Sequence, residues 1–262
     1  MKIAFLTLGC KLNYAETSTY ERAFVKAGYE VVPWQEKADV YLVNTCTVTA
    51  TSDAKSRNLI RKVHRINPNA QILVTGCSAQ LRRADIESIP GVTRVFGCNE
   101  KHLVCPSGST VSNNSAATAF AAFSTGERTR SFLKVQDGCD NFCKYCTVPY
   151  ARGGSRNIPI SVCVANAREI ASQGVKEIVL TGVNTGDFGR STGESFLDLL
   201  KALNDVEGIE RYRISSIEPN LLTEEIVEWI ASGTKFLPHF HIPVQSGCDK
   251  TLKEMHRRYT TE

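Results

Sequence analysis

The amino-acid sequence predicts an α/β protein built from two blocks, each of which alternates strands with helices. Short apolar runs typical of buried strands are separated by longer stretches in which apolar residues recur every three or four positions, as on a helix. Residues 105–130, rich in Ser, Thr, Ala and Asn, show no such period and interrupt the alternation. We therefore expect two parallel sheets covered by helices, in domains spanning 1–104 and 131–262 and joined by a linker at 105–130.

The first block begins with a strand and continues as a β-α repeat. Its strands are expected at 2–8, 39–45, 71–76 and 93–97, with helices near 50–66 and 78–88. Its first helix carries Ala23 and Phe24 on the apolar face and is expected to end at Gly28. Asn13, with Glu16 three residues later, predicts a capping box at the beginning of that helix.

The second block follows the same pattern. Its strands are expected at 131–136, 176–182, 211–217 and 239–244, with helices near 161–172, 196–203 and 223–230. Thr223 is placed to cap the last of these helices, and Gly233 to close it. A further helix is expected to begin at Leu252, where the repeat is incomplete at the end of the chain. We therefore expect a fragment of a longer protein, truncated before the last strands of a β/α barrel.

The composition is that of a globular protein. Of the 262 residues, 42% are hydrophobic and 22% charged, and the formal net charge of +4 permits a nucleic-acid partner without requiring one. No apolar run approaches the roughly 18 residues that a membrane span needs. The N-terminal MKIAFLTLGC is too short for the core of a signal peptide. We therefore expect a cytoplasmic protein, in which ten cysteines serve metal binding or catalysis rather than disulfides.

Three cysteines stand close together in the stretch DGCDNFCKYCTVPYARGG. Cys139, Cys143 and Cys146, called the barrel triad below, form a C-x3-C-x2-C array directly after the first strand of the second block. A 4Fe–4S cluster held by three thiolates keeps one iron without a protein ligand, open to another molecule. The alternative is a zinc site, but zinc usually takes two ligand pairs, and Cys163 and Cys248 each stand alone. The array therefore predicts an iron–sulfur cluster with an open iron.

A second set of three cysteines, the N-terminal triad, is spread over the first block. Cys10, Cys46 and Cys77 each follow a predicted strand. Because the carboxyl ends of parallel strands meet at one edge of a sheet, we expect a second three-cysteine cluster there, also with an open iron. The alternative is that each is an ordinary buried cysteine. Four cysteines lack such a placement and are interpreted as structural: Cys98, Cys105, Cys163 and Cys248.

These motifs carry a resemblance to a known family. A C-x3-C-x2-C array after the first strand of a β/α block resembles the signature of radical S-adenosylmethionine (radical SAM) enzymes. The stretches TLGCKLNYAET, LVNTCTVT, ILVTGC and DGCDNFCKYCTVPYARGGSR together resemble the methylthiotransferase family over essentially the whole chain outside the linker. Within that family GCKLNYAET, and Lys11 in particular, is similar to the branch that acts on N6-threonylcarbamoyladenosine (t6A) in tRNA.

The resemblance implies a flavodoxin-like N-terminal methylthiotransferase domain and a partial radical SAM barrel, without its last strands and without the small RNA-binding domain called TRAM. It implies two 4Fe–4S clusters and S-adenosylmethionine as cofactors. S-adenosylmethionine would bind the open iron at the barrel triad, and a 5′-deoxyadenosyl radical would remove hydrogen from C2 of the adenine. The cluster at the N-terminal triad would deliver a methylthio group to that carbon. No catalytic residue beyond the cluster ligands is implied.

Further contacts to S-adenosylmethionine are expected at the ends of later strands. Gly182 would let the backbone approach the methionyl amine, and Thr181 and Asn184 are placed to bond it. Glu218 and Gln245 end later strands, where a ribose or adenine can be held. The alternatives are a tight turn for the first group and ordinary polar strand ends for the second.

Two basic stretches are candidates for contact with phosphate. The predicted helix at 54–66 has one basic side, formed by Lys55, Arg57, Arg61, Lys62 and Arg65. Such a side can follow tRNA phosphates, and an ordinary exposed helix face is the alternative. The ARGG run and Arg156 are expected either to meet phosphate or the cofactor carboxylate, or to form a solvated loop.

The expected partners are a tRNA anticodon stem-loop, an electron donor such as a flavodoxin or ferredoxin system, and a sulfur donor, with no membrane. Two rival hypotheses keep the same chemistry but move it to isopentenyladenosine in tRNA or to a ribosomal protein. Two others assign a different class, either a non-catalytic iron–sulfur electron carrier or a zinc-binding structural module. A methylthio mass increment on the substrate separates the first two from the leading hypothesis. Iron content and cleavage of S-adenosylmethionine separate the others.

Overall fold

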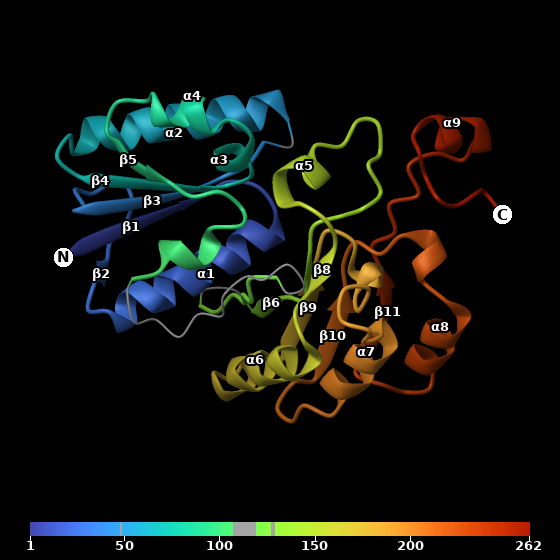
Figure 1. Cartoon of the computed structure of the whole chain (residues 1–262). Coiled ribbons are helices and arrows are strands. Elements are labelled where there is room, and N and C mark those ends of the chain that lie inside the picture. Colours follow the sequence, from blue (N-terminus) through green and yellow to red (C-terminus); the bar gives the residue numbers. More distant parts are fainter. Residues whose placement is uncertain (48, 107–118, 127–128) are drawn as a thin grey trace. The chain divides into compact units, whose positions relative to one another are not determined.

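The computed structural model describes residues 1–47, 49–106, 119–126 and 129–262, and the chain divides into two compact units (Figure 1). Unit 1 comprises Met1–Asn114 together with Tyr150–Arg152, and unit 2 comprises Ser115–Pro149 together with Gly153–Glu262. Each unit contains its own parallel sheet, as the sequence predicts. Within the described ranges, no helix is both long enough and apolar enough to cross a lipid bilayer.

Unit 1 is a parallel sheet in the order β2-β1-β3-β4-β5, with α1 and α2 on opposite faces (Figure 1). Its elements are β1 (Lys2–Thr7), α1 (Lys11–Lys26), β2 (Glu30–Val31), β3 (Val40–Thr45), α2 (Ala50–Ile66), β4 (Gln71–Gly76), α3 (Cys77–Leu81), α4 (Arg83–Glu87), β5 (Val92–Val95) and the 3₁₀ turn η1 (Lys101–Val104). This strand order is that of doubly wound, flavodoxin-like folds. Every residue of the central strand β3 is buried, which explains its continuous apolar run.

The predicted capping box at the beginning of α1 is wrong. Cys10 is the N-cap residue, and no side chain makes a capping hydrogen bond there. Asn13 lies inside the helix and donates from its amide to the carbonyl oxygens of Leu8 (2.7 Å) and Thr45 (3.0 Å). Because the helix begins almost one turn earlier than predicted, Asn13 and Glu16 fall on its buried face.

Unit 2 contains a parallel sheet in the order β11-β10-β9-β6 and a two-stranded antiparallel ribbon of β7 and β8. Its elements are β6 (Arg130–Lys134), β7 (Gln136–Asp137), β8 (Arg156–Asn157), α6 (Ile160–Ser172), β9 (Glu177–Thr181), η2 (Thr185–Asp187), α7 (Phe196–Asn204), β10 (Arg211–Ile214), η3 (Pro219–Leu221), α8 (Glu224–Ala231), β11 (Phe236–Phe240) and α9 (Asp249–Glu254). The short helix α5 (Val148–Arg152) is divided between the units, with Tyr150–Arg152 belonging to unit 1. The four parallel strands are neighbours in chain order, which is the arrangement of part of a β/α barrel.

The last strand of unit 2 differs from the prediction. The strand β11 spans Phe236–Phe240 instead of 239–244. Phe236 is buried and stacks on Tyr212 of β10, with ring centroids 4.8 Å apart. The buried aromatic pair therefore sets the position of this strand.

The predicted linker is partly outside the described residues, namely at 107–118 and 127–128. Its described stretch, 119–126, packs on unit 2. Phe123 belongs to the apolar core of that unit and forms an isolated antiparallel bridge with Leu133 of β6. This stretch is therefore part of the packed structure of unit 2.

Candidate iron–sulfur and cofactor sites

The N-terminal triad follows three neighbouring strands of unit 1. Cys10 comes after β1, Cys46 directly after β3 and Cys77 directly after β4. These strands are adjacent and parallel, and Thr45 pairs with Gly76, so Cys46 and Cys77 leave the sheet at the same level. Cys10 and Cys46 flank the point between β1 and β3 where the strand order reverses. Doubly wound folds bind their ligands at this point.

Two glycines let the loops of the N-terminal triad approach β3. Gly9 has φ +106°, and a Cβ atom there would lie 2.9 Å from the Cβ and 3.0 Å from the Sγ of Cys46. Gly76 has φ +102°, and a Cβ atom there would lie 2.6 Å from Oδ1 of Asn44. Only glycine adopts such a backbone and leaves this space open. The loop that carries Cys10 therefore lies directly against the side chain of Cys46.

A buried group of charges belongs to the same unit. Glu16 accepts from Nζ of Lys101 at 2.7 Å and from the guanidinium of Arg152 at 3.3 Å, and all three side chains are almost completely buried. Arg152 also donates to Oδ1 of Asn13 at 2.5 Å. The solvated loop considered for the ARGG run is therefore wrong at Arg152, because this side chain is part of the interior of unit 1.

Cys98, interpreted from the sequence as structural, contacts Cys77 in a small buried cluster. A hydrogen bond from the Cys98 thiol, with the charges of Arg152 and Lys101, lowers the pKa of Cys77 to about 6 in spite of burial. The same hydrogen bond and burial raise the pKa of Cys98. The sequence did contain a sign of this placement, because Cys98 follows β5, the neighbour of β4. This edge of the sheet thus holds a fourth thiol beside the predicted three.

The barrel triad lies in the loop that follows β7 of unit 2. Cys139 and Cys143 are buried and Cys146 is half-buried. The amide of Cys139 donates to the carbonyl of Gly153 at 3.0 Å, and the amide of Cys146 donates to the carbonyl of Cys143 at 2.9 Å, so the loop is folded back on itself. Burial raises the pKa of Cys139 to about 11.

Gly138 determines the course of this loop. It has φ +76°, and a Cβ atom there would lie 2.6 Å from the carbonyl oxygen of Gly153. The sequence contains five Gly-Cys dipeptides, and the glycine has a positive φ in only three of them, at Gly9, Gly76 and Gly138. All three precede a predicted cluster ligand. A positive φ of the preceding glycine therefore distinguishes Cys10, Cys77 and Cys139 from Cys98 and Cys248.

The alternative to a cluster is a site for a single metal ion, such as zinc. Among the residues that the structure describes, no three His, Cys, Asp or Glu side chains lie close enough together to hold one metal ion. A cluster of four irons and four sulfides occupies more space than one ion. The six cysteines therefore stay predicted cluster ligands.

Gln136 connects the barrel triad to the next two strand ends. Its Oε1 accepts from the amides of Val183 (2.9 Å) and Asn184 (3.0 Å), and its side-chain amide donates to the carbonyl of Gly138 (2.7 Å). Oδ1 of Asn184 in turn accepts from the amide of Glu218 at 3.2 Å. The structure thus brings Asn184 and Glu218 together, and their contact with S-adenosylmethionine stays a prediction. Sequence analysis missed Gln136, although a polar residue at the end of an apolar strand was visible.

Arg257 binds both the barrel triad and Glu218. Its Nη1 donates to Sγ of Cys143 at 3.3 Å and to Oε1 of Glu218 at 2.7 Å. Asn141 donates to the other carboxylate oxygen of Glu218 at 2.8 Å. Glu218 is therefore held between a cation and an amide. The sequence gave no local indication of Arg257, which is 39 residues away from Glu218.

The remaining predicted cofactor residues are placed differently. Gly182 packs against Gln136, whose Oε1 would lie 2.8 Å from an added Cβ atom. The hydroxyl of Thr181 donates to the carbonyl of Val179 in its own strand at 3.1 Å. Gln245 is exposed, has φ +62° and accepts from the hydroxyl of Tyr145 at 3.0 Å. Thr181 and Gln245 are thus not part of the hydrogen-bonded group around Asn184.

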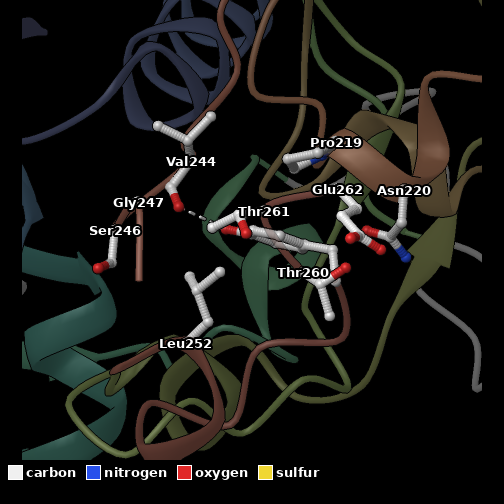
Figure 2. Close-up of a pocket in the computed structure, with 10 residues that line it drawn as sticks. Pro219, Asn220, Val244, Ser246, Gly247, Leu252, Thr260, Thr261 and Glu262 are labelled. Atoms are coloured by element: carbon white, nitrogen blue, oxygen red, sulfur yellow. Dashed lines mark hydrogen bonds between the residues drawn. The ribbon is translucent and has the colours of Figure 1, made fainter. Parts of the chain in front are cut away.

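A pocket of about 640 Å³ lies in unit 2, and its lining includes Pro219, Val244 and Ser246, which are chain neighbours of Glu218 and Gln245 (Figure 2). Its lining comprises Pro219, Asn220, Val244, Ser246, Gly247, Leu252 and residues 259–262. The hydroxyl of Tyr259 donates to the carbonyl of Val244 at 3.2 Å, the dashed line in Figure 2. The volume is typical of a site for a small molecule.

The two isolated cysteines of unit 2 should differ in reactivity. Cys248 is exposed, and hydrogen bonds from the amide and hydroxyl of Thr251 lower its pKa, which increases its thiolate fraction near neutral pH. Cys163 is fully buried, and burial raises its pKa. In metal-free folded protein, we expect iodoacetamide to label Cys248 at least roughly tenfold faster than Cys163, measured by peptide mass spectrometry. The difference should disappear in urea. Equal rates in the folded protein would contradict a structural role for Cys163.

Two family models match the chain. The model described as uncharacterized protein family UPF0004 matches residues 2–97, and the radical SAM superfamily model matches residues 133–262. Among solved structures, the chain is similar to TsrM from Kitasatospora setae, a radical S-adenosylmethionine methyltransferase solved with cobalamin and a 4Fe–4S cluster. The TM-score is 0.65 at 14% identity, over 99% of this chain and 64% of that one. This likeness supports the fold.

Curated relatives match both units together. The chain is 42% identical, over 99% of its length, to threonylcarbamoyladenosine tRNA methylthiotransferase MtaB of Bacillus subtilis, and 37% identical over its whole length to MtaB of Aquifex aeolicus. It is 31% identical to tRNA-2-methylthio-N(6)-dimethylallyladenosine synthase of Roseobacter denitrificans. The chain spans 61%, 67% and 64% of these three proteins. Because both family models match and these relatives align with nearly the whole of this chain, the chain belongs to the radical SAM tRNA methylthiotransferase family.

Proposed function

We propose that this protein is a tRNA methylthiotransferase that inserts a methylthio group at C2 of t6A, next to the anticodon. The observation that carries the proposal is the placement of two cysteine triads, one after three parallel strands of unit 1 and one in the loop after β7 of unit 2. One triad suits radical formation and the other suits the holding of a sulfur atom. The choice of t6A is supported by the names of the relatives from Bacillus subtilis and Aquifex aeolicus and by the stretch GCKLNYAET.

The residues of unit 2 fit a 4Fe–4S cluster and S-adenosylmethionine. Three thiols in a loop shaped by Gly138 are the right donors for iron, and the polar groups of Gln136, Asn184 and Glu218 lie beside them. When bound, these cofactors supply radical abstraction of a hydrogen atom from the substrate. Gln136 positions the turn after β9, and Arg257 holds the carboxylate of Glu218 and donates to Cys143.

The residues of unit 1 fit a second cluster. Cys10 and Cys46 flank the reversal point of the strand order, Cys77 follows the next strand, and Gly9 and Gly76 leave the space that their loops need. The hydrogen bond from the Cys98 thiol, with the buried cations Arg152 and Lys101, lowers the pKa of Cys77 and so favours the thiolate, which is the form that binds iron. We assign the holding of the transferred sulfur to this site. Beyond the six ligands we assign no catalytic residue.

The proposal includes the partners and the compartment. The substrate is the anticodon stem-loop of a tRNA, electrons come from a flavodoxin or ferredoxin system, and a separate donor supplies sulfur. We place the protein in the cytoplasm, where tRNA and these reductants occur.

Cofactor content tests the two sites separately. Anaerobically reconstituted protein is expected to hold about eight irons, and removal of either whole triad by alanine substitution should leave about four. Four irons or fewer in the reconstituted unsubstituted protein would overturn the N-terminal site. Colourless protein that holds zinc would overturn both.

Substrate preference is tested with three acceptors. Reduced, reconstituted protein is incubated with tRNA that contains t6A, with tRNA that contains isopentenyladenosine, and with ribosomal protein, and each product is analysed by mass spectrometry. We expect the methylthio increment on t6A alone. An increment on either of the other acceptors would assign the protein to that branch of the family. If the protein did not cleave S-adenosylmethionine, the result would favour a non-catalytic electron carrier.

A further inference from the structure

The helix α2 carries an excess of positive charge. This helix contains five basic residues, Lys55, Arg57, Arg61, Lys62 and Arg65, and one acidic residue, Asp53. Its net charge of +4 therefore equals the formal net charge of the whole chain, so the other residues sum to zero. Such concentration on one helix is the electrostatic pattern of a nucleic-acid contact.

The structure shows that these cations are not equivalent. Arg57 is half-buried and forms an ion pair with Asp53, so its charge is largely neutralised within unit 1. Lys62 lies over the ring of Trp34, with Nζ 4.7 Å from the ring centroid. Arg61 and Arg65 are exposed, and the described part of the chain offers neither of them an ion-pair partner. Within the described residues, Arg57 is thus the one basic side chain of α2 that forms an ion pair, and the other four are exposed.

Arg61 and Arg65 line a pocket of about 470 Å³ on the surface of unit 1. The other lining residues are Asn58, His64 and Pro90. No acidic residue belongs to this lining. Two arginines one helical turn apart repel each other, and an anion bound between them removes that repulsion.

Two packing features fix the position of the pocket, namely the buried side of α2 and the contact between His64 and Gly91. Ser56, Ile60 and Val63 form the buried side of α2 and so turn the two arginines toward solvent. The ring of His64 packs directly against Gly91, whose φ of +88° and missing Cβ atom make room for it. The arginines therefore stand on a rigid support, so less freedom is lost when they bind a ligand.

The chemistry of the pocket suits a nucleic-acid phosphate. Arginine donates two parallel hydrogen bonds to a phosphate group, and an asparagine amide can add another. The proline and the histidine ring add flat surface for a sugar or a base. We propose that this pocket binds the phosphate backbone of the RNA substrate, an inference that rests on the proposed function and identifies a surface of unit 1 that meets the RNA.

The position of α2 supports this role. At its N-terminal end, Asp53 accepts a hydrogen bond from Ser78, which follows Cys77, and the hydroxyl of Ser56 donates to the carbonyl of Cys46 at 3.3 Å. At 1.5 Å per residue, Arg61 and Arg65 lie about 12 to 18 Å along the helix from that end. An RNA held by the pocket can therefore extend along α2 to the N-terminal triad.

The test measures RNA binding and RNA modification in parallel. A fluorescent RNA stem-loop with the anticodon-loop sequence is titrated with the unsubstituted protein, with R61A/R65A, and with R168A/K201A. The last variant removes two exposed charges from α6 and α7 of unit 2 and serves as the matched control. Titrations are repeated between about 50 and 200 mM salt. Circular dichroism and thermal melting confirm that each variant is folded.

We expect R61A/R65A to weaken binding about tenfold at low salt and to reduce the slope of log K against log salt by about 1.4, at roughly 0.7 for each lost single-strand phosphate contact. The control should bind like the unsubstituted protein. Equal affinity and equal salt dependence of R61A/R65A and the unsubstituted protein would overturn the inference. Absence of RNA binding by the unsubstituted protein would also overturn it. Weakened binding by R61A/R65A, with no methylthio increment from the unsubstituted protein, would support the pocket and overturn the proposed function.

Discussion

Replacement of Gly138 by alanine is expected to abolish the cluster at the barrel triad and to lower the iron content by about four per chain. The residue has φ +76°, and an added Cβ atom would collide with the carbonyl oxygens of Gly153 and Gly154. Positive φ alone costs roughly 1–2 kcal/mol in a residue with a side chain, and the contacts with rigid backbone add to this cost. Because the loop cannot keep its path, Cys139 is displaced from its partners.

The chain offers a matched control for this substitution. Gly247 also precedes a cysteine, Cys248, but its φ is not positive and a Cβ atom there would meet nothing within 4 Å. Gly247→Ala should therefore keep the full iron content after anaerobic reconstitution. Iron and sulfide analysis, with the visible absorption of the cluster, measures both variants. Full retention of iron by Gly138→Ala would mean that the geometry of this loop is not needed to hold the cluster.

Replacement of Glu16 by glutamine should destabilise unit 1 by about 3–5 kcal/mol, the cost of breaking a buried ion pair by removing one partner. The carboxylate binds Lys101 at 2.7 Å and Arg152 at 3.3 Å, and none of the three side chains is exposed by more than 2%. Its loss removes the carboxylate that binds both buried cations. The same change should lower the iron content at the N-terminal triad. Glu16 is a buried residue of α1, and Cys10 is the residue directly before this helix.

Urea unfolding followed by tryptophan fluorescence measures this effect. The chain has two tryptophans, Trp34 in unit 1 and Trp229 in unit 2, so a Trp229→Phe background reports on unit 1 alone. Glu30→Gln is the control, because Glu30 pairs with Lys2 at the surface at 4.0 Å, and such pairs contribute about 1 kcal/mol or less. If Glu16→Gln and Glu30→Gln shifted the urea midpoint equally, the buried group would have no special role in stability.

Local patterns were sufficient for most of the long strands, although not for the bounds of β11, and for placing Cys10, Cys46 and Cys77 after strands of one sheet. Parallel strands buried on both faces are continuous apolar runs, and β3 and β9 are recognisable for that reason. The residue after such a run lies at the carboxyl edge of its sheet, which is why Cys46 and Cys77 could be assigned to one edge. The family resemblance depended on the same short motifs.

Local sequence patterns do not predict contacts between residues that are far apart in the chain. Glu16 is 85 residues from Lys101 and 136 from Arg152, and no periodicity connects them. Taken alone, Asn13 and Glu16 looked like a capping box, because local spacing favours that interpretation. In the structure, burial of the helix face decides their role. Cys98 was likewise interpreted as structural because it was not counted among the cysteines at strand ends, although it lies against Cys77.

The sequence by itself determined the two-block α/β organisation, the two cysteine triads and the family. Only the tertiary structure decided which side chains support those triads, namely Gln136, Arg257 and the Glu16 group, and which basic residues of α2 are left facing solvent. The physical reason is that periodicity and motif spacing record local backbone geometry and burial. Hydrogen bonds and ion pairs between remote positions depend on how the strands are ordered in the sheet, and that order is a property of the folded chain.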